Sequence, residues 1–306
     1  MEHDASAGIL YNLQRYSLHD GPGIRSTVFF KGCPLRCRWC SNPESQNSGR
    51  ELFYNRQECA GCGACASACG SGALRIAFPG GKPEYDASTC LRCFHCASAC
   101  VTGALEVKGY RTDVKTLIKE LLKDAAFFRE SDGGVTLSGG EPLAQPDFAA
   151  ALLEALANEG IHTCIETCGC VPVEAFRKVI PHTGLIYFDV KHCDASKHRE
   201  YTGAGTEAIF RNLEYILSEG CRVTVRIPVI PGFNHDAESM DAIAALISSL
   251  GVRQVNLLPF HQFGLAKYAS LFRQYAMTTE KQLYDDDIAG YCDIFSTYHI
   301  EAKTGG

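Results

Sequence analysis

Three cysteines near the start of the chain have the spacing that iron–sulfur chemistry requires. Cys33, Cys37 and Cys40, here called the cysteine triad, follow the pattern C-x3-C-x2-C. Three thiolates on one short loop bind three irons of a [4Fe–4S] cluster and leave the fourth iron open to another molecule, as catalytic zinc sites leave one position open. A zinc knuckle and a fourth ligand from a distant cysteine are the alternatives. The spacing favours a cluster with one open iron.

A second group of cysteines forms two similar runs with the bacterial ferredoxin spacing C-x2-C-x2-C-x3-C. The segment from Cys59 to Leu74 matches the segment from Cys90 to Leu105, so the chain contains an internal repeat with a period of 31 residues. In such pairs the fourth cysteine of each run binds the cluster of the other run. Zinc is the alternative, although zinc sites rarely use tandem sets of four evenly spaced cysteines. The predicted ligands are Cys59, Cys62, Cys65 and Cys100 for one cluster and Cys90, Cys93, Cys96 and Cys69 for the other.

The composition suits an iron–sulfur enzyme better than a disulfide-stabilised protein. The chain has 306 residues and 17 cysteines, but its amino terminus lacks the basic start and apolar run of an export signal. The net charge of −6 without basic clusters gives no basis for nucleic-acid binding, and no apolar stretch reaches the roughly 20 residues that span a bilayer. We therefore predict a cytoplasmic protein without nucleic-acid or membrane partners. The cysteines without ligand spacing are expected to be buried free thiols: Cys164, Cys168, Cys170, Cys193, Cys221 and Cys292.

The elements that must position these groups alternate between strands and helices. Strands are expected at residues 26–30, 134–138, 162–167, 184–190, 222–227 and 254–259. Helical patterns cover residues 113–122, 146–156, 173–179, 206–219 and 236–250, with Gly220 and Gly251 as C-caps of the last two. This alternation predicts an α/β fold with a parallel sheet, either a partial (β/α)6 TIM-type barrel or a doubly wound sheet.

Three segments are predicted along the chain. Residues 1–50 contain the first barrel strand and the loop of the cysteine triad. Residues 51–108 form an inserted bacterial-ferredoxin-like α+β domain with two clusters, and residues 109–306 complete the barrel. In both kinds of sheet, ligands bind at the carboxyl ends of the strands.

Polar or small residues follow the expected strands at those ends. Asp189 and Lys191 are two residues apart, so they face the same side and can address one polar ligand. Arg226 can pair with a carboxylate, and the glycines before Glu141 allow a ligand close to the backbone. Each feature alone is more typical of a β–α turn, a solvated ion pair or a structural histidine. The candidate residues at these ends are Gly139, Gly140, Glu141, Glu166, Asp189, Val190, Lys191, Arg226 and His261.

The cysteine triad, with Trp39 directly before its last cysteine, resembles the defining motif of the radical S-adenosylmethionine superfamily. The resemblance implies that the amino and carboxylate groups of S-adenosylmethionine chelate the open iron. It also implies that one electron from the reduced cluster cleaves the sulfonium and yields a 5′-deoxyadenosyl radical, so no side chain acts as a catalytic acid or base. The cofactor contacts implied are Trp39, Cys40, Ser41 and the strand-end residues named above, with a monovalent cation near Asp189, Glu166 and Thr167.

The sequences that flank the triad narrow this resemblance. Asp20-Gly-Pro-Gly-Ile-Arg25 and Val28-Phe-Phe-Lys-Gly32 precede it, and Ser41-Asn-Pro-Glu44 follows it. Together they are similar to the signature of glycyl-radical-enzyme activating enzymes, and the likeness extends over the whole barrel portion. It implies an oxidoreductase of anaerobic metabolism that takes a hydrogen atom from a glycine α-carbon of a partner enzyme and gives 5′-deoxyadenosine and methionine.

The repeated cysteine unit resembles the insert of the longer activating enzymes. Those serve choline trimethylamine-lyases, arylacetate decarboxylases, benzylsuccinate synthases, glycerol-type dehydratases and isethionate sulfite-lyases, so a partner of this group is expected. Three [4Fe–4S] clusters are then expected, with electrons passing from a flavodoxin or ferredoxin through the insert, although a structural or docking role is an alternative. Radical chemistry on a small molecule leaves the flanking sequences unexplained, and simple electron carriage leaves the triad unexplained.

Overall fold

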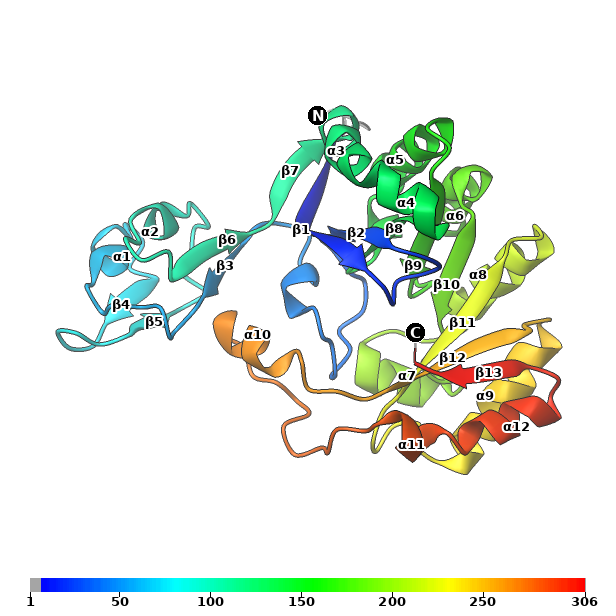
Figure 1. The fold of residues 1–306 in the computed structure, drawn as a ribbon. Helices are drawn as coiled ribbons and strands as arrows, with labels where there is room; N and C mark the ends of the chain where they lie inside the picture. The colour runs from blue at the N-terminus through cyan, green and yellow to red at the C-terminus, as the bar shows by residue number, and fades with distance from the viewer. Residues whose placement is uncertain (1–6, 306) are drawn as a thin grey trace.

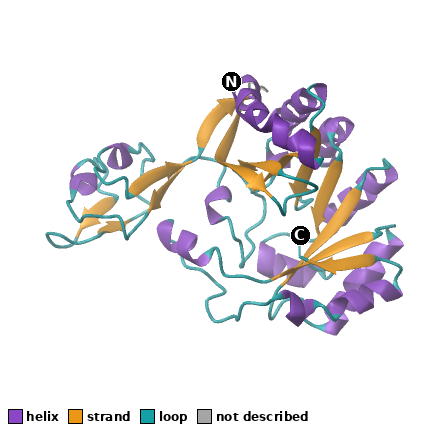
Figure 2. Cartoon of the chain, viewed as in Figure 1, coloured by secondary structure: helices purple, strands orange, loops and turns teal. Residues whose placement is uncertain are grey.

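A computed structural model describes residues 7–305 of the chain (Figure 1). Residues 1–6, on which the expected lack of an export signal depends, lie outside the described residues, as does residue 306. Within the described range, no helix is both long and apolar enough to cross a membrane. Strands and helices alternate over most of the chain (Figure 2).

One sheet of nine strands forms the body of the described part of the molecule (Figure 1). Its strands are β1 (Ala7–Ser17), β2 (Arg25–Phe30), β7 (Tyr110–Asp113), β8 (Gly134–Gly139), β9 (His162–Thr167), β10 (Leu185–Asp189), β11 (Val223–Val229), β12 (Gln254–Pro259) and β13 (Glu301–Thr304). Their order is β13-β12-β11-β10-β9-β8-β2-β1-β7. The strands from β2 to β13 are parallel, and β1 runs antiparallel to both β2 and β7. All six expected strands, and the parallel sheet, are confirmed.

The strand order decides between the two sheets that the sequence left open. Among the parallel strands, each one lies beside its predecessor in the chain, and the order never reverses. A doubly wound sheet requires such a reversal, so that alternative is wrong. The sequence did not predict β1, β7 or β13. Strand β13 pairs with β12 over only four residues, from Glu301 to Thr304, which is too short to show a strand period.

Helices cover the outer face of this sheet (Figure 1), and the expected helix ends are confirmed. The Asp113 side chain accepts a hydrogen bond from the Thr116 N–H at 2.7 Å, which caps α3. Gly220 and Gly251 follow α8 and α9 with positive φ values of 73° and 95°. The covering helices are α3 (Val114–Leu121), α4 (Ala125–Ser131), α5 (Pro146–Asn158), α6 (Val173–Val179), α8 (Glu207–Ser218), α9 (Ala237–Ser249) and α12 (Tyr291–Thr297).

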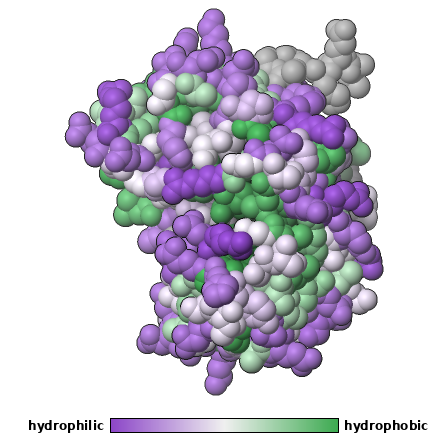
Figure 3. All heavy atoms as spheres, turned by 90° about the vertical axis from the view of Figure 1, so that its right-hand side faces the viewer, coloured by the Kyte–Doolittle hydropathy of each residue, from purple (hydrophilic) through white to green (hydrophobic). Residues whose placement is uncertain are grey.

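Apolar packing against the sheet explains why these helices form. Helix α5 buries Phe148, Leu152, Leu153 and Leu156 against the sheet at helical spacing. The outward faces are polar, and Figure 3 shows a mostly hydrophilic surface with apolar side chains gathered near its middle. Shorter elements lie in the loops: η1 (Pro43–Ser45), η2 (Leu122–Asp124), η3 (Pro142–Ala144), η4 (Ile180–His182), α7 (Ala195–Thr202), α10 (Leu265–Ser270) and α11 (Asp285–Ile288).

The cysteine-rich repeat forms a separate lobe, at the left of Figure 1. Strand β3 (Glu51–Tyr54) pairs antiparallel with β6 (Leu105–Lys108), and Glu51 lies opposite Lys108. Between them, each copy of the repeat contributes one short helix, and a hairpin joins the copies. These elements are α1 (Ala64–Ser67), β4 (Leu74–Ile76), β5 (Pro83–Tyr85) and α2 (His95–Ser98). The β3–β6 ladder thus begins and ends at the residues expected to bound the insert.

Candidate functional site

The loop that follows β2 carries the cysteine triad and is fixed from two sides. On one side, the Gly32 and Cys33 N–H groups donate to the carbonyls of Ser45 and Gln46 at 2.6 and 3.2 Å. On the other, the Arg36 N–H donates to the Thr202 carbonyl, at the end of α7, at 2.7 Å. All three triad cysteines line one cavity of about 260 Å³, here called the cofactor cavity.

The carboxyl ends of the parallel strands supply the opposite wall of the cofactor cavity. This is the edge at which ligands bind in parallel sheets. Of the residues predicted to contact the cofactor, most lie on this wall or on the triad loop: Trp39, Cys40, Ser41, Gly139, Gly140, Glu166, Asp189, Lys191, Arg226 and His261. The structure therefore brings together residues from sequence positions far apart.

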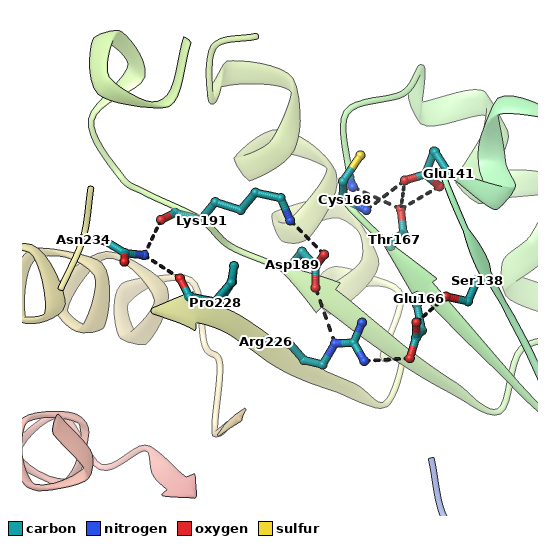
Figure 4. Close-up of polar contacts among 11 residues, drawn as sticks. Ser138, Glu141, Glu166, Thr167, Cys168, Asp189, Lys191, Arg226, Pro228 and Asn234 are labelled. Carbon is teal, nitrogen blue, oxygen red and sulfur yellow. Dashed lines mark hydrogen bonds and ion pairs between the residues drawn. The ribbon is translucent and has the colours of Figure 1, made fainter. Parts of the chain in front are cut away.

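Four charged side chains form a paired network at the floor of this cavity (Figure 4). The Arg226 guanidinium donates to Glu166 Oε1 at 2.6 Å and to Asp189 Oδ1 at 3.4 Å. Lys191 Nζ donates to the other Asp189 oxygen at 2.8 Å. Two carboxylates and two cations thus balance in charge, which offsets part of the cost of holding them out of water.

The pairing controls the protonation of Asp189. Burial alone would raise the pKa of this carboxyl, but the neighbouring Lys191 and Arg226 hold the pKa below its ordinary value. Asp189 is therefore a carboxylate at neutral pH. Burial also opposes the charge of Lys191, but Asp189 outweighs it and raises the pKa of the ammonium. The four charged side chains of Glu166, Asp189, Lys191 and Arg226 are here called the ionic floor. Their fixed arrangement suits a ligand that carries both an ammonium and a carboxylate group.

Glu141 and Val190 do not line the cofactor cavity, in contrast to the other predicted contacts. Both side chains are fully buried. The Glu141 carboxylate accepts hydrogen bonds from Thr167 Oγ1 at 2.9 Å, the Cys168 N–H at 2.8 Å and the Leu143 N–H at 3.0 Å. Burial raises its pKa. Glu141 thus joins the end of β9 to the turn after β8, and the sequence pattern gave no sign that its partners lie within the protein.

The two glycines before Glu141 are required by the approach of protein backbone. Gly139 has a φ of 112°, and a Cβ there would lie 2.4 Å from the Phe30 nitrogen. A Cβ on Gly140 would lie 2.4 Å from the Gly32 carbonyl oxygen. The glycines therefore let the end of β8 approach β2 and the start of the triad loop, because only glycine leaves this space and tolerates this φ.

Sequence reasoning gave no role to Asn234 and expected Cys168, near a strand end, to be a buried free thiol. The buried Asn234 side chain donates to the Lys191 and Pro228 carbonyls, both at 2.8 Å, and joins the backbone after β10 to the last part of β11 (Figure 4). Cys168 lines the cavity, and its hydrogen bond with Cys33 lowers the pKa of the Cys33 thiol. Cys168 follows β9 directly, which was the available signal; Asn234 belongs to no recognisable motif.

The eight cysteines of the repeat surround two small cavities. The first insert cavity is lined by Cys59, Cys62, Cys65 and Cys100, and the second insert cavity by Cys69, Cys90, Cys93 and Cys96. Each cavity thus takes three cysteines from one run and one from the other. Among the described residues, no three Cys, His, Asp or Glu side chains converge as ligands of a single ion would.

Backbone N–H groups point at the cysteine sulfurs in the same way in both copies. The Gly61 and Arg92 N–H groups donate to Cys59 and Cys90 at 3.4 and 3.3 Å. The Leu74 and Leu105 N–H groups donate to the last cysteine of each run, both at 3.4 Å. Such donors favour thiolates, the form that binds iron. Four cysteines around each cavity and these donors fit a [4Fe–4S] cluster.

Comparison with known proteins agrees with this geometry. The radical SAM superfamily matches residues 90–243, and the 4Fe-4S dicluster domain matches residues 46–104. The trans-4-hydroxy-L-proline dehydratase activating enzyme of Clostridioides difficile is 39% identical over 97% of this chain and 99% of its own. The isethionate sulfite-lyase activating enzyme of Nitratidesulfovibrio vulgaris is 42% identical over 89% of this chain and 90% of its own.

A solved structure supports the fold. Streptococcus suis SuiB bound to its precursor peptide SuiA aligns with 90% of this chain and 46% of its own, with a TM-score of 0.51 and 12% identity. At this identity the likeness concerns the fold alone. The relatives and the family matches establish the rest: the chain belongs to the glycyl-radical-enzyme activating enzymes of the radical SAM superfamily. It is therefore a radical enzyme that uses S-adenosylmethionine and iron–sulfur clusters.

Proposed function

We propose that this chain activates a partner glycyl radical enzyme by reductive cleavage of S-adenosylmethionine. A hydrogen atom leaves a glycine α-carbon of the partner, and 5′-deoxyadenosine and methionine are the products. The observation that carries this proposal is the cofactor cavity, which joins three cysteines with an open side to a charged floor at the strand ends. The chain shares nearly its whole length with an activating enzyme, so the proposal covers the complete reaction.

The cavity residues divide into those that bind and those that position. The cysteine triad would hold the [4Fe–4S] cluster, which supplies the electron for cleavage when bound. The ionic floor of Glu166, Asp189, Lys191 and Arg226 would bind the polar groups of S-adenosylmethionine, and a monovalent cation beside Asp189 would share that carboxylate with Lys191 and Arg226. The other contacts on the cavity wall would be Trp39, Ser41, Gly139, Gly140 and His261. Glu141 and Val190 then position the wall without contact.

The sheet and the lobe are interpreted in the same way. We infer that the ordered parallel strands form a partial (β/α)6 TIM-type barrel, to which residues 1–50 and 109–306 contribute. Support comes from a strand order without reversal and from the helices that cover the outer face of the sheet. Residues 51–108 would be a ferredoxin-like domain that binds two of three [4Fe–4S] clusters, supported by the two cavities with four cysteines each.

The partner is proposed as a class. The relatives are named as activating enzymes of trans-4-hydroxy-L-proline dehydratase, isethionate sulfite-lyase and choline trimethylamine-lyase, at 38 to 42% identity. Because relatives that serve different enzymes have similar identities to this chain, overall identity does not select one partner enzyme. We propose a lyase or dehydratase of this group, with a flavodoxin or ferredoxin as electron donor.

The test uses the full chain, purified and reconstituted with iron and sulfide without oxygen. It is mixed with each candidate partner, S-adenosylmethionine and titanium(III) citrate, and the glycyl radical is measured by electron paramagnetic resonance. One partner of the group should give the radical together with 5′-deoxyadenosine. Formation of 5′-deoxyadenosine with a small molecule but no radical on any partner would contradict the proposal. The Cys37→Ala variant is the matched control, and it should give neither product.

A further inference from the structure

One segment far along the chain connects the insert with the triad loop. Residues 264–273, here called the connecting segment, contain α10 and follow β12 by a few residues. At its start, Gly264 lies so close to the triad loop that a Cβ there would be 2.5 Å from the Cys40 carbonyl oxygen. Tyr268, in the middle of the segment, is buried. The barrel end of the segment therefore lies against Cys40.

The other end of the connecting segment enters the core of the insert. The apolar cluster of the insert consists of residues between 51 and 108 together with Phe272, which is the one member from outside that range among the described residues. The Phe272 ring stacks on Tyr54 at 5.4 Å and lies 4.9 Å from the Tyr85 ring. Tyr54 lines the first insert cavity and Tyr85 lines the second. One side chain thus contacts a wall of each cavity.

The backbone at Phe272 adopts a left-handed conformation directly after the end of α10. Phe272 has a φ of 56°, in the left-handed region that bulky residues rarely occupy. Such a conformation persists only where the surrounding structure compensates for it, and it is often found at functional positions.

Polar contacts fix the connecting segment to both of its neighbours. Lys267 contacts Asn42 Oδ1 and Glu44 Oε1, each at 2.8 Å, just after the triad. Arg273 donates to the Pro43 carbonyl at 3.0 Å and pairs with Glu51, the first residue of β3. Glu51 in turn pairs at 3.0 Å with the buried Lys31, two residues before Cys33. The segment is thus a rigid contact between the two iron–sulfur regions.

We propose that the connecting segment is the route by which electrons pass from the insert to the triad loop, with Phe272 as the contact that both insert cavities share. This rests on the proposed function. In each turnover, a one-electron protein donor of the ferredoxin or flavodoxin class reduces the insert. One electron then leaves the insert, which is reoxidised, and reduces the cluster of the triad.

The test compares Phe272→Ala with Phe272→Tyr, which keeps the aromatic ring, and with Phe272→Leu, which keeps an apolar side chain without a ring. The surface variant Phe78→Ala, which removes an exposed aromatic ring of the insert, is the matched control. Each protein is reconstituted, its iron is counted, and the reduction of the triad cluster by reduced ferredoxin is followed by freeze-quench electron paramagnetic resonance. Titanium(III) citrate, a small reductant that needs no docking surface, is the second electron source.

With ferredoxin, Phe272→Ala should reduce the triad cluster about tenfold more slowly than the wild type, because the removed ring leaves a gap. With titanium(III) citrate, its rate should stay within about twofold, since the ring does not line the cofactor cavity. Phe272→Tyr and Phe78→Ala should resemble the wild type with both reductants. Two results would overturn the proposal. One is a Phe272→Ala variant with full iron content whose triad cluster ferredoxin reduces at the wild-type rate. The other is a variant whose triad cluster is reduced more slowly by the same factor with both reductants.

If Phe272→Ala loses the insert clusters, Phe272→Leu and Phe272→Tyr decide the question. Slower ferredoxin reduction in the leucine variant, at equal iron content, supports the route through the ring, and equal rates overturn it. The measurement reads cluster reduction and not glycyl radical formation. A wild-type chain that is reduced normally but activates no partner would contradict the proposed function and leave this inference intact.

Discussion

The cofactor cavity and the two insert cavities are all built around cysteines, but their walls differ. The cofactor cavity has three cysteines and also presents Glu166, Asp189, Lys191 and Arg226. Each insert cavity has four cysteines and no charged residue on its wall. Three ligands with a polar wall leave a place where a molecule binds and reacts, whereas four ligands in an apolar wall close the site. The difference teaches that one region has room for a ligand beside its cysteines, whereas the other encloses its cysteines fully, as suits the electron transfer that we propose for it.

Removal of one triad cysteine should have the largest effect. The Cys37→Ala variant should lose about four of about twelve irons and form no detectable 5′-deoxyadenosine, because the open cluster is the site of cleavage. The insert clusters should keep their electron paramagnetic resonance signals. Iron analysis and product chromatography measure this, with Cys292→Ala in α12 as the control. Loss of all iron in Cys37→Ala would show that the two regions are not independent.

A change in the ionic floor should weaken cofactor binding without loss of iron. Asp189→Asn leaves Lys191 and Arg226 without their shared carboxylate, so the affinity for S-adenosylmethionine should fall about tenfold to hundredfold. Equilibrium binding to the reconstituted protein measures this. Asp147→Asn is the matched control, because Asp147 forms an exposed ion pair with Lys178 away from the cavity. If Asp189→Asn binds S-adenosylmethionine as tightly as the wild type does, the ionic floor is not part of the cofactor site.

Two double variants test whether each insert cluster takes three cysteines from one run and one from the other. Cys59→Ala with Cys100→Ala removes two cysteines of the first insert cavity, so about eight irons should remain and the second insert cluster should keep its spectrum. Cys59→Ala with Cys69→Ala removes one cysteine from each cavity and should alter both spectra. Iron analysis and Mössbauer spectroscopy separate these results. The reverse pattern would mean that each run binds its own cluster.

The smallest expected effect is a pH dependence from His261. Burial lowers the pKa of this imidazole in the folded protein. Because the pKa is lowered, folding favours the neutral imidazole. The stability that this group contributes to the folded protein is complete above the unfolded pKa of about 6.5, and it is lost as pH falls below that value. Affinity for S-adenosylmethionine, itself a cation, depends on the lowered pKa of the folded protein, so it should be constant from about pH 6.5 to 8.5 and weaken only at lower pH, as the imidazole gains a proton. His261→Asn should flatten this dependence, and an unchanged profile in that variant would assign it to another group.

Much of the fold and of the site could be predicted because its signals are local. The spacing of Cys33, Cys37 and Cys40 and the repeat of the two later runs are properties of short loops. Six of the parallel strands could be recognised in the sequence, and their ligand-binding ends followed from that. The hydrogen bonds that Glu141 accepts could not be predicted, because its partners Thr167 and Cys168 belong to another strand end.

The sequence by itself determined the chemistry of this protein: one open cysteine triad, two closed cysteine sets and the strand ends that complete a cofactor pocket. Each of these signals is a motif of a few neighbouring residues, so it could be recognised in the sequence before the motifs were brought together. Only the tertiary structure decided that the strand order has no reversal, that Arg226 pairs with Asp189, and that Phe272 enters the insert. Such contacts join residues far apart in the chain, and packing of the whole fold, which no local pattern encodes, selects them.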